Sequence, residues 1–177
     1  MIFKETKLKG AFLIEVKKLE DNRGFFGRAW CQKEFKEHSL VTDLAQMNVA
    51  FNNKNGILRG MHYQAAPYEE VKLVRCTRGA VYDVIIDLRP NSDTYKQWIG
   101  VELTADNYRM LYVPAGFAHG YQTLTDNSEI FYLVSEYYKA TAEKGVRWDD
   151  SAFNIEWPSV SKRIISEKDS RWPDFQD

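Results

Sequence analysis

Residues able to transfer a proton cluster in one short stretch of the chain, residues 56–64. The stretch contains His62, one of only three histidines in the chain. A neutral imidazole accepts a proton near neutral pH, and it acts as a general base when a carboxylate orients its second ring nitrogen. Glycines, an arginine, and aliphatic and aromatic residues surround His62, so we expect it to point into a walled cleft. The stretch therefore predicts a catalytic base.

A base of this kind needs a carboxylate partner and a cation near the developing negative charge. The candidate carboxylates are Asp83, Asp87 and Asp169. The candidate cations are Arg23, Arg59 and Lys72, in strand or turn positions from which they could bind a phosphate or an oxyanion. Any one cation alone is typical of a solvated strand face, and only their occurrence around one cleft favours a site. Tyr132 and Tyr138 are equally compatible with core aromatics.

A second chemistry, catalysis by a bound metal ion, would use the same histidines. The flanks of His62 and His119 resemble the two cupin motifs: Gly56, His62, the pair Glu69-Glu70 and Gly79 for the first, and Pro114, Gly116 and His119 for the second. Metal-binding cupins carry another histidine two positions after the first, where this chain has Gln64. A metal would be left with His62, His119 and either Glu69 or Glu70. Three protein ligands can hold a catalytic metal, so this alternative stays open, although Gln64 favours a metal-free base.

The elements that must position these residues are mostly strands. Aromatic residues make up 14% of the chain, and apolar runs alternate with turn residues every 8 to 12 positions or so, a spacing typical of sandwiches, jelly rolls and small barrels. Strands are predicted at 11–16, 25–30, 46–51, 57–64, 72–76, 80–88, 98–103, 109–113, 121–124 and 129–136. Residues 32–44 predict a short helix or irregular connection, 114–120 a connection that carries His119, and 166–169 a helical turn.

Charge and cysteine usage exclude several classes of protein. The net charge is −1 without charge blocks, which gives no electrostatic support for binding to nucleic acid or an acidic membrane. No apolar run approaches the roughly 20 residues that span a bilayer, and Lys4, Glu5, Lys7 and Lys9 interrupt any N-terminal signal sequence. Cys31 and Cys76 show no paired spacing, so we expect reduced thiols and a cytoplasmic location.

The residues above also carry a family resemblance. The chain resembles the dTDP-4-dehydrorhamnose 3,5-epimerase family of cupin-fold nucleotide-sugar epimerases nearly from end to end. The matching positions are Arg23-Gly24-Phe25-Phe26, Gln46, Asn48, residues 58–64, 72–75 and 78–79, Asp83, residues 87–89, Trp98, residues 114–120, Tyr132, and residues 145–150, 157–158 and 166–169. The resemblance implies an isomerase of the all-β class, a cupin-type jelly roll or β-barrel with short peripheral helices.

The resemblance also implies a role for each matching site residue. His62 would remove a proton beside the sugar ketone, Asp169 would stabilise its imidazolium, Lys72 would stabilise the enolate, and Tyr132 would return a proton to the opposite face. The substrate-binding set would comprise Arg23, Phe26, Arg28, Gln46, Asn48, Arg59, Asp83, His119 and Tyr138. The implied substrate is a nucleoside diphosphate sugar such as dTDP-4-dehydro-6-deoxyglucose, used to make deoxysugars for dTDP-rhamnose and lipopolysaccharide O-antigen. No metal or organic cofactor is implied.

A homodimer with exchanged N-terminal strands is implied as well. We expect a single domain, residues 1–177, with three parts. These are the N-terminal strands and dimer arm (1–45), the barrel core (46–138) and a C-terminal tail packed on the barrel (139–177). Two departures from the family pattern bear on the substrate. Arg28 replaces a glutamate, and residues 46–52 differ from the common Gln-Asp-Asn-His-Ser version. An epimerase of one carbon on another nucleotide-sugar therefore remains an alternative, as does a binding module without activity.

Overall fold

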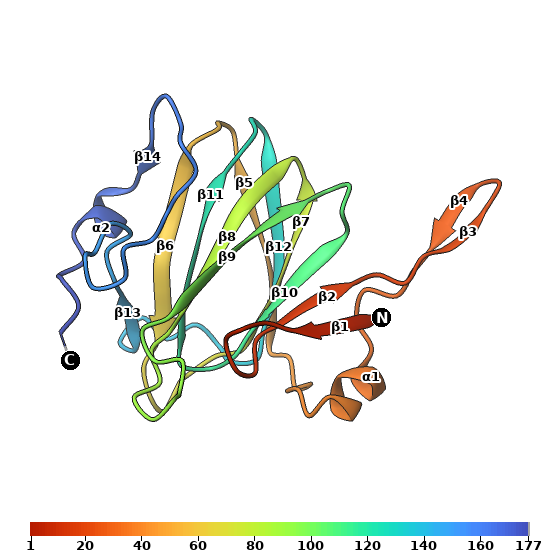
Figure 1. The fold of residues 1–177 in the computed structure, drawn as a ribbon, viewed down its shortest axis with the longest axis horizontal. Coiled ribbons are helices and arrows are strands. Elements are labelled where there is room, and N and C mark those ends of the chain that lie inside the picture. The colour runs from red at the N-terminus through yellow and green to blue at the C-terminus, as the bar shows by residue number, and fades with distance from the viewer. Residues whose placement is uncertain (177) are drawn as a thin grey trace.

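The computed structural model describes residues 1–176 as two facing antiparallel sheets with short flanking elements (Figure 1). The first sheet has the order β1-β2-β10-β7-β12-β5. Its strands are β1 (Ile2–Glu5), β2 (Phe12–Glu15), β10 (Arg109–Val113), β7 (Lys72–Arg78), β12 (Ser128–Val134) and β5 (Gln46–Asn52). The N-terminal strands β1 and β2 thus belong to the same sheet as β10, β7, β12 and β5.

The second sheet has the order β13-β6-β11-β8-β9. Its strands are β13 (Glu143–Gly145), β6 (Ile57–Gln64), β11 (Phe117–Thr123), β8 (Ala80–Asp87) and β9 (Trp98–Thr104). The short strand β14 (Ile164–Ile165) pairs with β6 in parallel, and helix α2 (Glu167–Ser170) follows it. The C-terminal segment therefore lies against β6, the strand that carries His62 (Figure 1).

The hydrophobic core lies between the sheets and extends onto both outer faces. Val74 and Ile130 of the first sheet pack against Val81 and Ile85 of the second. A cluster around Phe35 of helix α1 (Gln32–Glu37) covers the outside of the first sheet. On β8, Ile85 faces the inner cluster and Ile86 the outer one beneath the C-terminal segment. This confirms the prediction that the continuous apolar run of this strand is buried on both faces, and it confirms the all-β jelly-roll class.

The structure corrects two predicted elements. The strand predicted at 25–30 ends at Phe26, because β4 (Gly24–Phe26) pairs only with β3 (Leu19–Asp21) and this hairpin projects away from the sheets (Figure 1). Residues 117–120 were predicted as a connection but belong to β11. That strand pairs along its whole length with β8 and partly with β6, and all seven of its residues are buried. The short helix after residue 31 and the helical turn at 166–169 are confirmed.

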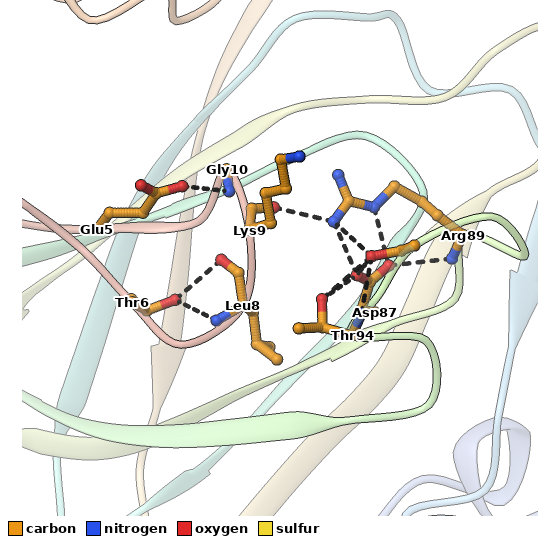
Figure 2. Close-up of polar contacts among 9 residues, drawn as sticks. Glu5, Thr6, Leu8, Lys9, Gly10, Asp87, Arg89 and Thr94 are labelled. Carbon is orange, nitrogen blue, oxygen red and sulfur yellow. Dashed lines mark hydrogen bonds and ion pairs between the residues drawn. The ribbon is translucent and has the colours of Figure 1, made fainter.

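A buried carboxylate holds the N-terminal turn against the end of β8 (Figure 2). Asp87 accepts hydrogen bonds from Arg89 Nε at 2.8 Å and from the hydroxyl of Thr94 at 2.7 Å. Arg89 Nη2 in turn donates to the carbonyl oxygen of Lys9 at 2.9 Å. Burial alone would raise the pKa of Asp87, but the bonds from Arg89, Ser92 and Thr94 outweigh it and lower the pKa to about 2. Asp87, one of the three candidate partners of His62, is thus committed to a structural ion pair.

Candidate active site

A polar cleft opens between the two sheets and is lined by side chains from both. Its outer part, a cavity of about 300 Å³, is bounded by Gln46 and Asn48 of β5 and by His62 of β6, among others. Its inner part, about 220 Å³, is bounded by Arg59, His119 and Tyr121, among others. His62, Lys72 and Tyr132 line both parts. The structure therefore brings the predicted base, cation and proton donor into one continuous cleft.

Asp169 is the carboxylate that pairs with His62. His62 Nε2 lies 2.6 Å from Asp169 Oδ1. The pairing of β14 with β6 brings α2 to this position, and the hydroxyl of Ser166 caps α2 by accepting from the Asp169 N–H. A carboxylate can only accept, so Nε2 carries the proton and Nδ1 is left as the proton acceptor. The pair thus defines which nitrogen of His62 can act as a base.

The environment of Asp169 keeps it ionised. Burial is the largest influence and by itself would raise the pKa of this carboxyl, because it disfavours the charged form. The hydrogen bond and charge of His62 and the backbone N–H of Gly60, which lies 3.3 Å from Oδ2, outweigh it and lower the pKa. An ionised Asp169 is suited to stabilise an imidazolium on His62.

A second histidine–aspartate pair lies deeper in the cleft. His119 Nε2 is 2.7 Å from Asp83 Oδ1, and Asp83 is fully buried on the neighbouring strand β8. Its other oxygen, Oδ2, has no hydrogen-bond partner among the described residues. The third histidine, His38, is remote from the cleft and stacks on Phe3. The structure therefore separates the three candidate aspartates, because only Asp169 contacts His62.

The two cations in the cleft are each held by a neighbour. Lys72 Nζ lies 3.1 Å from Glu70 Oε1, and the lysine is almost entirely buried. Arg59 Nε donates to Asn52 Oδ1 at 2.9 Å. Burial, followed by the nearby negative charge of Glu70, raises the pKa of Tyr132, so its hydroxyl stays protonated at neutral pH. The cleft thus holds a basic imidazole, two cations and a protonated phenol.

Three predicted substrate-binding residues lie away from the cleft of their own chain. Arg23 forms an ion pair with Asp21 in the projecting hairpin, and Phe26 is 69% exposed there. Arg28, which follows the hairpin, is paired with Glu34 of α1. Tyr138 in contrast lies at the mouth of the cleft. Its hydroxyl donates to Glu143 at 2.8 Å.

Gln64, at the position of the second cupin-motif histidine, is committed to backbone groups. Its Nε2 donates to the carbonyl oxygens of Tyr68 at 2.9 Å and Tyr137 at 3.2 Å, and its Oε1 accepts from the Lys139 N–H. Gln64 thereby holds in place the segment that carries Tyr138.

Among residues 1–176, no group of three or more His, Cys, Asp or Glu side chains is arranged to hold a metal ion.

Known proteins are similar to this chain in both sequence and fold. A family profile described as dTDP-4-dehydrorhamnose 3,5-epimerase matches residues 5–177. The enzyme of that name from Sinorhizobium fredii is 40% identical over 173 residues, which is 98% of this chain and 89% of the relative. The chain belongs to the dTDP-4-dehydrorhamnose 3,5-epimerase family. It is an epimerase, and the predicted resemblance is confirmed.

Solved structures of the same family superimpose closely on this epimerase. The crystal structure of dTDP-4-dehydrorhamnose 3,5-epimerase from Elizabethkingia anophelis has a TM-score of 0.96 at 37% identity, covering 99% of this chain and 96% of that one. The enzyme from Bacillus anthracis, solved with TDP and PPi bound, has a TM-score of 0.93 at 41% identity, covering 98% and 100%. The cupin-like fold is thereby shown as well.

Sequence reasoning missed several residues that shape the epimerase cleft. Glu143 lines it and binds both Tyr138 and Lys168, so it joins the mouth of the cleft to α2. Asn52 binds Arg59, and Glu70, weighed only as a metal ligand, is the partner of Lys72. Glu143 follows the last long strand, where the strand signal is weak, so the sequence offered no sign of its pairing with β6. Asn52 resembled an ordinary turn residue because Asn53, Lys54 and Asn55 follow it.

No helix among the described residues is both long and apolar enough to cross a membrane.

Proposed function

We propose that this epimerase inverts carbon centres next to the ketone of a 4-keto-6-deoxy sugar carried on dTDP. The observation that carries the proposal is the arrangement of two side chains from facing sheets around one cleft. His62 comes from β6 of the second sheet and Tyr132 from β12 of the first, and both line the same cavity. A base and an acid on opposite sides of a bound sugar are what inversion of a stereocentre requires.

The reaction proceeds through an enolate. His62 Nδ1 takes the proton from the carbon beside the ketone, and the electrons of the C–H bond move onto the ketone oxygen. Lys72 stabilises the oxyanion that results. Tyr132 then gives its proton to the opposite face of the same carbon, and the C=O bond re-forms. Water restores the Tyr132 proton and takes up the one on His62, so atoms and charges balance and each proton transfer has a named side chain.

The same cleft supplies groups for binding the substrate. Arg59 is the cation suited to the diphosphate, since a guanidinium can bind phosphate oxygens through two parallel N–H bonds. Gln46, Asn48 and Tyr138 at the mouth are suited to the nucleoside, and the His119–Asp83 pair to the sugar hydroxyls. The TDP and PPi bound to the Bacillus anthracis enzyme support a thymidine diphosphate substrate.

A second copy of the chain completes the site in this proposal. Met47 and Val49 are each 60% exposed on β5, at the edge of the first sheet, and Leu19 and Phe26 are exposed on the projecting hairpin. Exposed apolar side chains of this kind mark a surface that a partner covers. In a homodimer the arm of one copy crosses to its partner, where Arg23 and Phe26 reach the partner's cleft.

The free thiols of Cys31 and Cys76 suit the reducing cytoplasm.

Proton NMR of candidate substrates in deuterium oxide tests the proposal. With this epimerase, dTDP-4-keto-6-deoxyglucose should lose the resonance of each proton that His62 removes, and signals of an epimerised sugar should appear. The number of lost resonances reports whether one or two carbons are inverted. The same sugar on CDP or UDP serves as the control for the nucleotide. No deuterium incorporation into any 4-keto nucleotide-sugar would refute the proposal.

A further inference from the structure

Asn52 is a buried amide at the end of β5 with no part in the proton transfers. The residue is 1% exposed, and both polar atoms of its side chain make hydrogen bonds. Oδ1 accepts from Arg59 Nε at 2.9 Å. Nδ2 lies 3.3 Å from the carbonyl oxygens of Ala50 and Ser128 and 3.2 Å from the hydroxyl of Tyr121. A buried amide with this many partners has little freedom to move.

Those partners also determine which way the amide faces. The carbonyl oxygens of Ala50 and Ser128 can only accept hydrogen bonds, so the NH₂ group must point toward them. The oxygen of the amide is thereby directed at Arg59, whose guanidinium can only donate. The orientation of Asn52 is therefore dictated by backbone atoms of β5 and β12 and does not depend on a ligand.

This contact restricts Arg59 before any ligand arrives. A free arginine side chain loses rotamer entropy when it is immobilised. The bond to Asn52 uses Nε, and among residues 1–176 no protein acceptor contacts either terminal nitrogen of Arg59. Both terminal nitrogens are thus left for an anion in the cavity that Arg59 lines. A phosphate group is the class of ligand that such a fork binds best.

We infer that Asn52 is a positioning residue that pre-organises Arg59 to bind the diphosphate of the substrate. The inference rests on the proposed function, because it takes Arg59 to be the phosphate ligand. Asn52 itself touches neither the phosphates nor the reacting carbon. Its contribution is to substrate affinity, since a cation already held in place loses less entropy when the ligand binds.

A merely structural role for Asn52 must be separated from this one, because its amide also ties β5 to β12 through Ser128. The chain offers a matched control in Gln122. This fully buried amide accepts from Arg163 Nε at 2.9 Å and donates to the carbonyl oxygen of Pro158. Asn52 and Gln122 therefore make the same kind of bond, but Gln122 lies outside the residues that line the cleft.

The test is a double-mutant cycle on the full-length protein, with Asn52→Ala, Arg59→Ala, the double variant and the control Gln122→Ala. The dissociation constant for TDP is measured by calorimetry, KM and kcat by turnover, and the melting temperature by circular dichroism. Asn52→Ala should weaken TDP binding and raise KM by roughly tenfold, with kcat changed less than about twofold, and should add no further loss once Arg59 is removed. Gln122→Ala should lower the melting temperature while TDP affinity is unchanged.

Two results would overturn the inference and can be told apart. If Arg59→Ala binds TDP as the wild type does, Arg59 is not the phosphate ligand, and that part of the proposed function fails together with the inference. If Arg59→Ala weakens binding but Asn52→Ala does not, or weakens it equally with and without Arg59, only the inference fails. Asn52→Ser, which keeps a small polar group but cannot reach Arg59, gives the same comparison should the alanine variant not fold.

Discussion

His62 and His119 lie directly opposite each other on the antiparallel strands β6 and β11, and each is bonded to its own aspartate. The two pairs have nearly equal lengths, 2.6 Å and 2.7 Å, but different surroundings. The His62 side chain is 32% exposed to the cleft, whereas that of His119 is 10% exposed. The exposed imidazole can meet a substrate proton, while the deeper pair forms the floor of the cleft. One ladder of two strands thus carries both histidines, while their aspartates come from α2 and from β8.

Replacing each histidine in turn should separate these two roles. His62→Asn should lower kcat by about 10²- to 10⁴-fold, the range that general-base catalysis contributes, and should remove deuterium exchange into the sugar. His119→Asn, the matched change, should mainly raise KM and destabilise the fold, because Asp83 would be left buried without its partner. Steady-state kinetics and NMR in deuterium oxide measure both. Wild-type exchange by His62→Asn would show that another group is the base.

Tyr132→Phe should uncouple the removal of the proton from its replacement. The phenyl ring keeps the shape of the cleft wall, but the hydroxyl that protonates the opposite face is gone. We expect deuterium to enter the sugar, since His62 can remove a proton and return a deuteron on the same side, while formation of the epimer falls by about 10²-fold or more. Comparing exchange with product formation in one NMR sample checks this. Equal losses of exchange and product would assign Tyr132 a different role.

How far the site could be predicted is clearest for Asp169. The residue type, position and role were predicted from the family resemblance, but His62 and the sequence around it left Asp83, Asp87 and Asp169 equivalent. The choice depends on contacts between residues 107 positions apart. The pairing of β14 with β6 brings Asp169 to His62, but it involves only two residues of β14, Ile164 and Ile165. A strand that short has no alternating pattern from which the pairing could be predicted. Local sequence predicts local structure, and this pairing is not local.

The arm should serve the cleft of the partner rather than its own. Two variants, each inactive alone, are co-expressed with different tags. One carries His62→Asn, and the other carries Arg23→Ala and Phe26→Ala. Dimers that carry both tags are then purified. Each mixed dimer has one cleft with an intact His62 and an intact arm from the other copy, so about half of wild-type activity should return. Mixed dimers without activity would place each arm at its own cleft. A molar mass of one chain, measured by light scattering, would refute the proposed homodimer.

Two predicted elements failed for physical reasons that apply beyond these residues. The hairpin at β3 and β4 is short because it has no third strand to extend it, which the apolar residues at 25–30 do not reveal. At 117–120, the glycines and the proline nearby predict a connection, yet β11 runs between β6 and β8, and its pairing with β8 holds Gly120 in a strand opposite Val84. Tertiary pairing outweighs local propensity in both places.

Removing the amide of Gln64 should loosen the mouth of the cleft. Gln64→Ala leaves the carbonyl oxygens of Tyr68 and Tyr137 and the N–H of Lys139 without this partner, at a cost of about 1–3 kcal/mol in the free energy of unfolding. The segment carrying Tyr138 should then move more freely, so KM should rise more than kcat falls. Gln64→Glu, which can accept from Lys139 but cannot donate to the carbonyls, should behave similarly. Urea denaturation and kinetics measure both, and unchanged KM in both variants would exclude a role in binding.

The ion pair of Asp87 should make stability depend on pH in an acidic window. The pKa of Asp87 is about 2 in the folded chain against an ordinary value of 3.8. A lowered folded pKa means that the stabilisation is complete well above pH 3.8 and is lost as the pH falls toward 2. The free energy of unfolding should therefore decrease by about 1 kcal/mol between pH 5 and pH 3 on account of this group.

Comparison with Asp87→Asn isolates this contribution, because asparagine does not titrate. The variant should be less stable than the wild type at pH 7, since Arg89 loses its ionic partner, and the difference between the two should shrink as the pH is lowered from 5 to 3. Urea denaturation at several pH values measures it. Asp106→Asn provides the control, because Asp106 is an exposed aspartate in the turn between β9 and β10. A difference between wild type and Asp87→Asn that stays constant from pH 5 to pH 3 would contradict the lowered pKa.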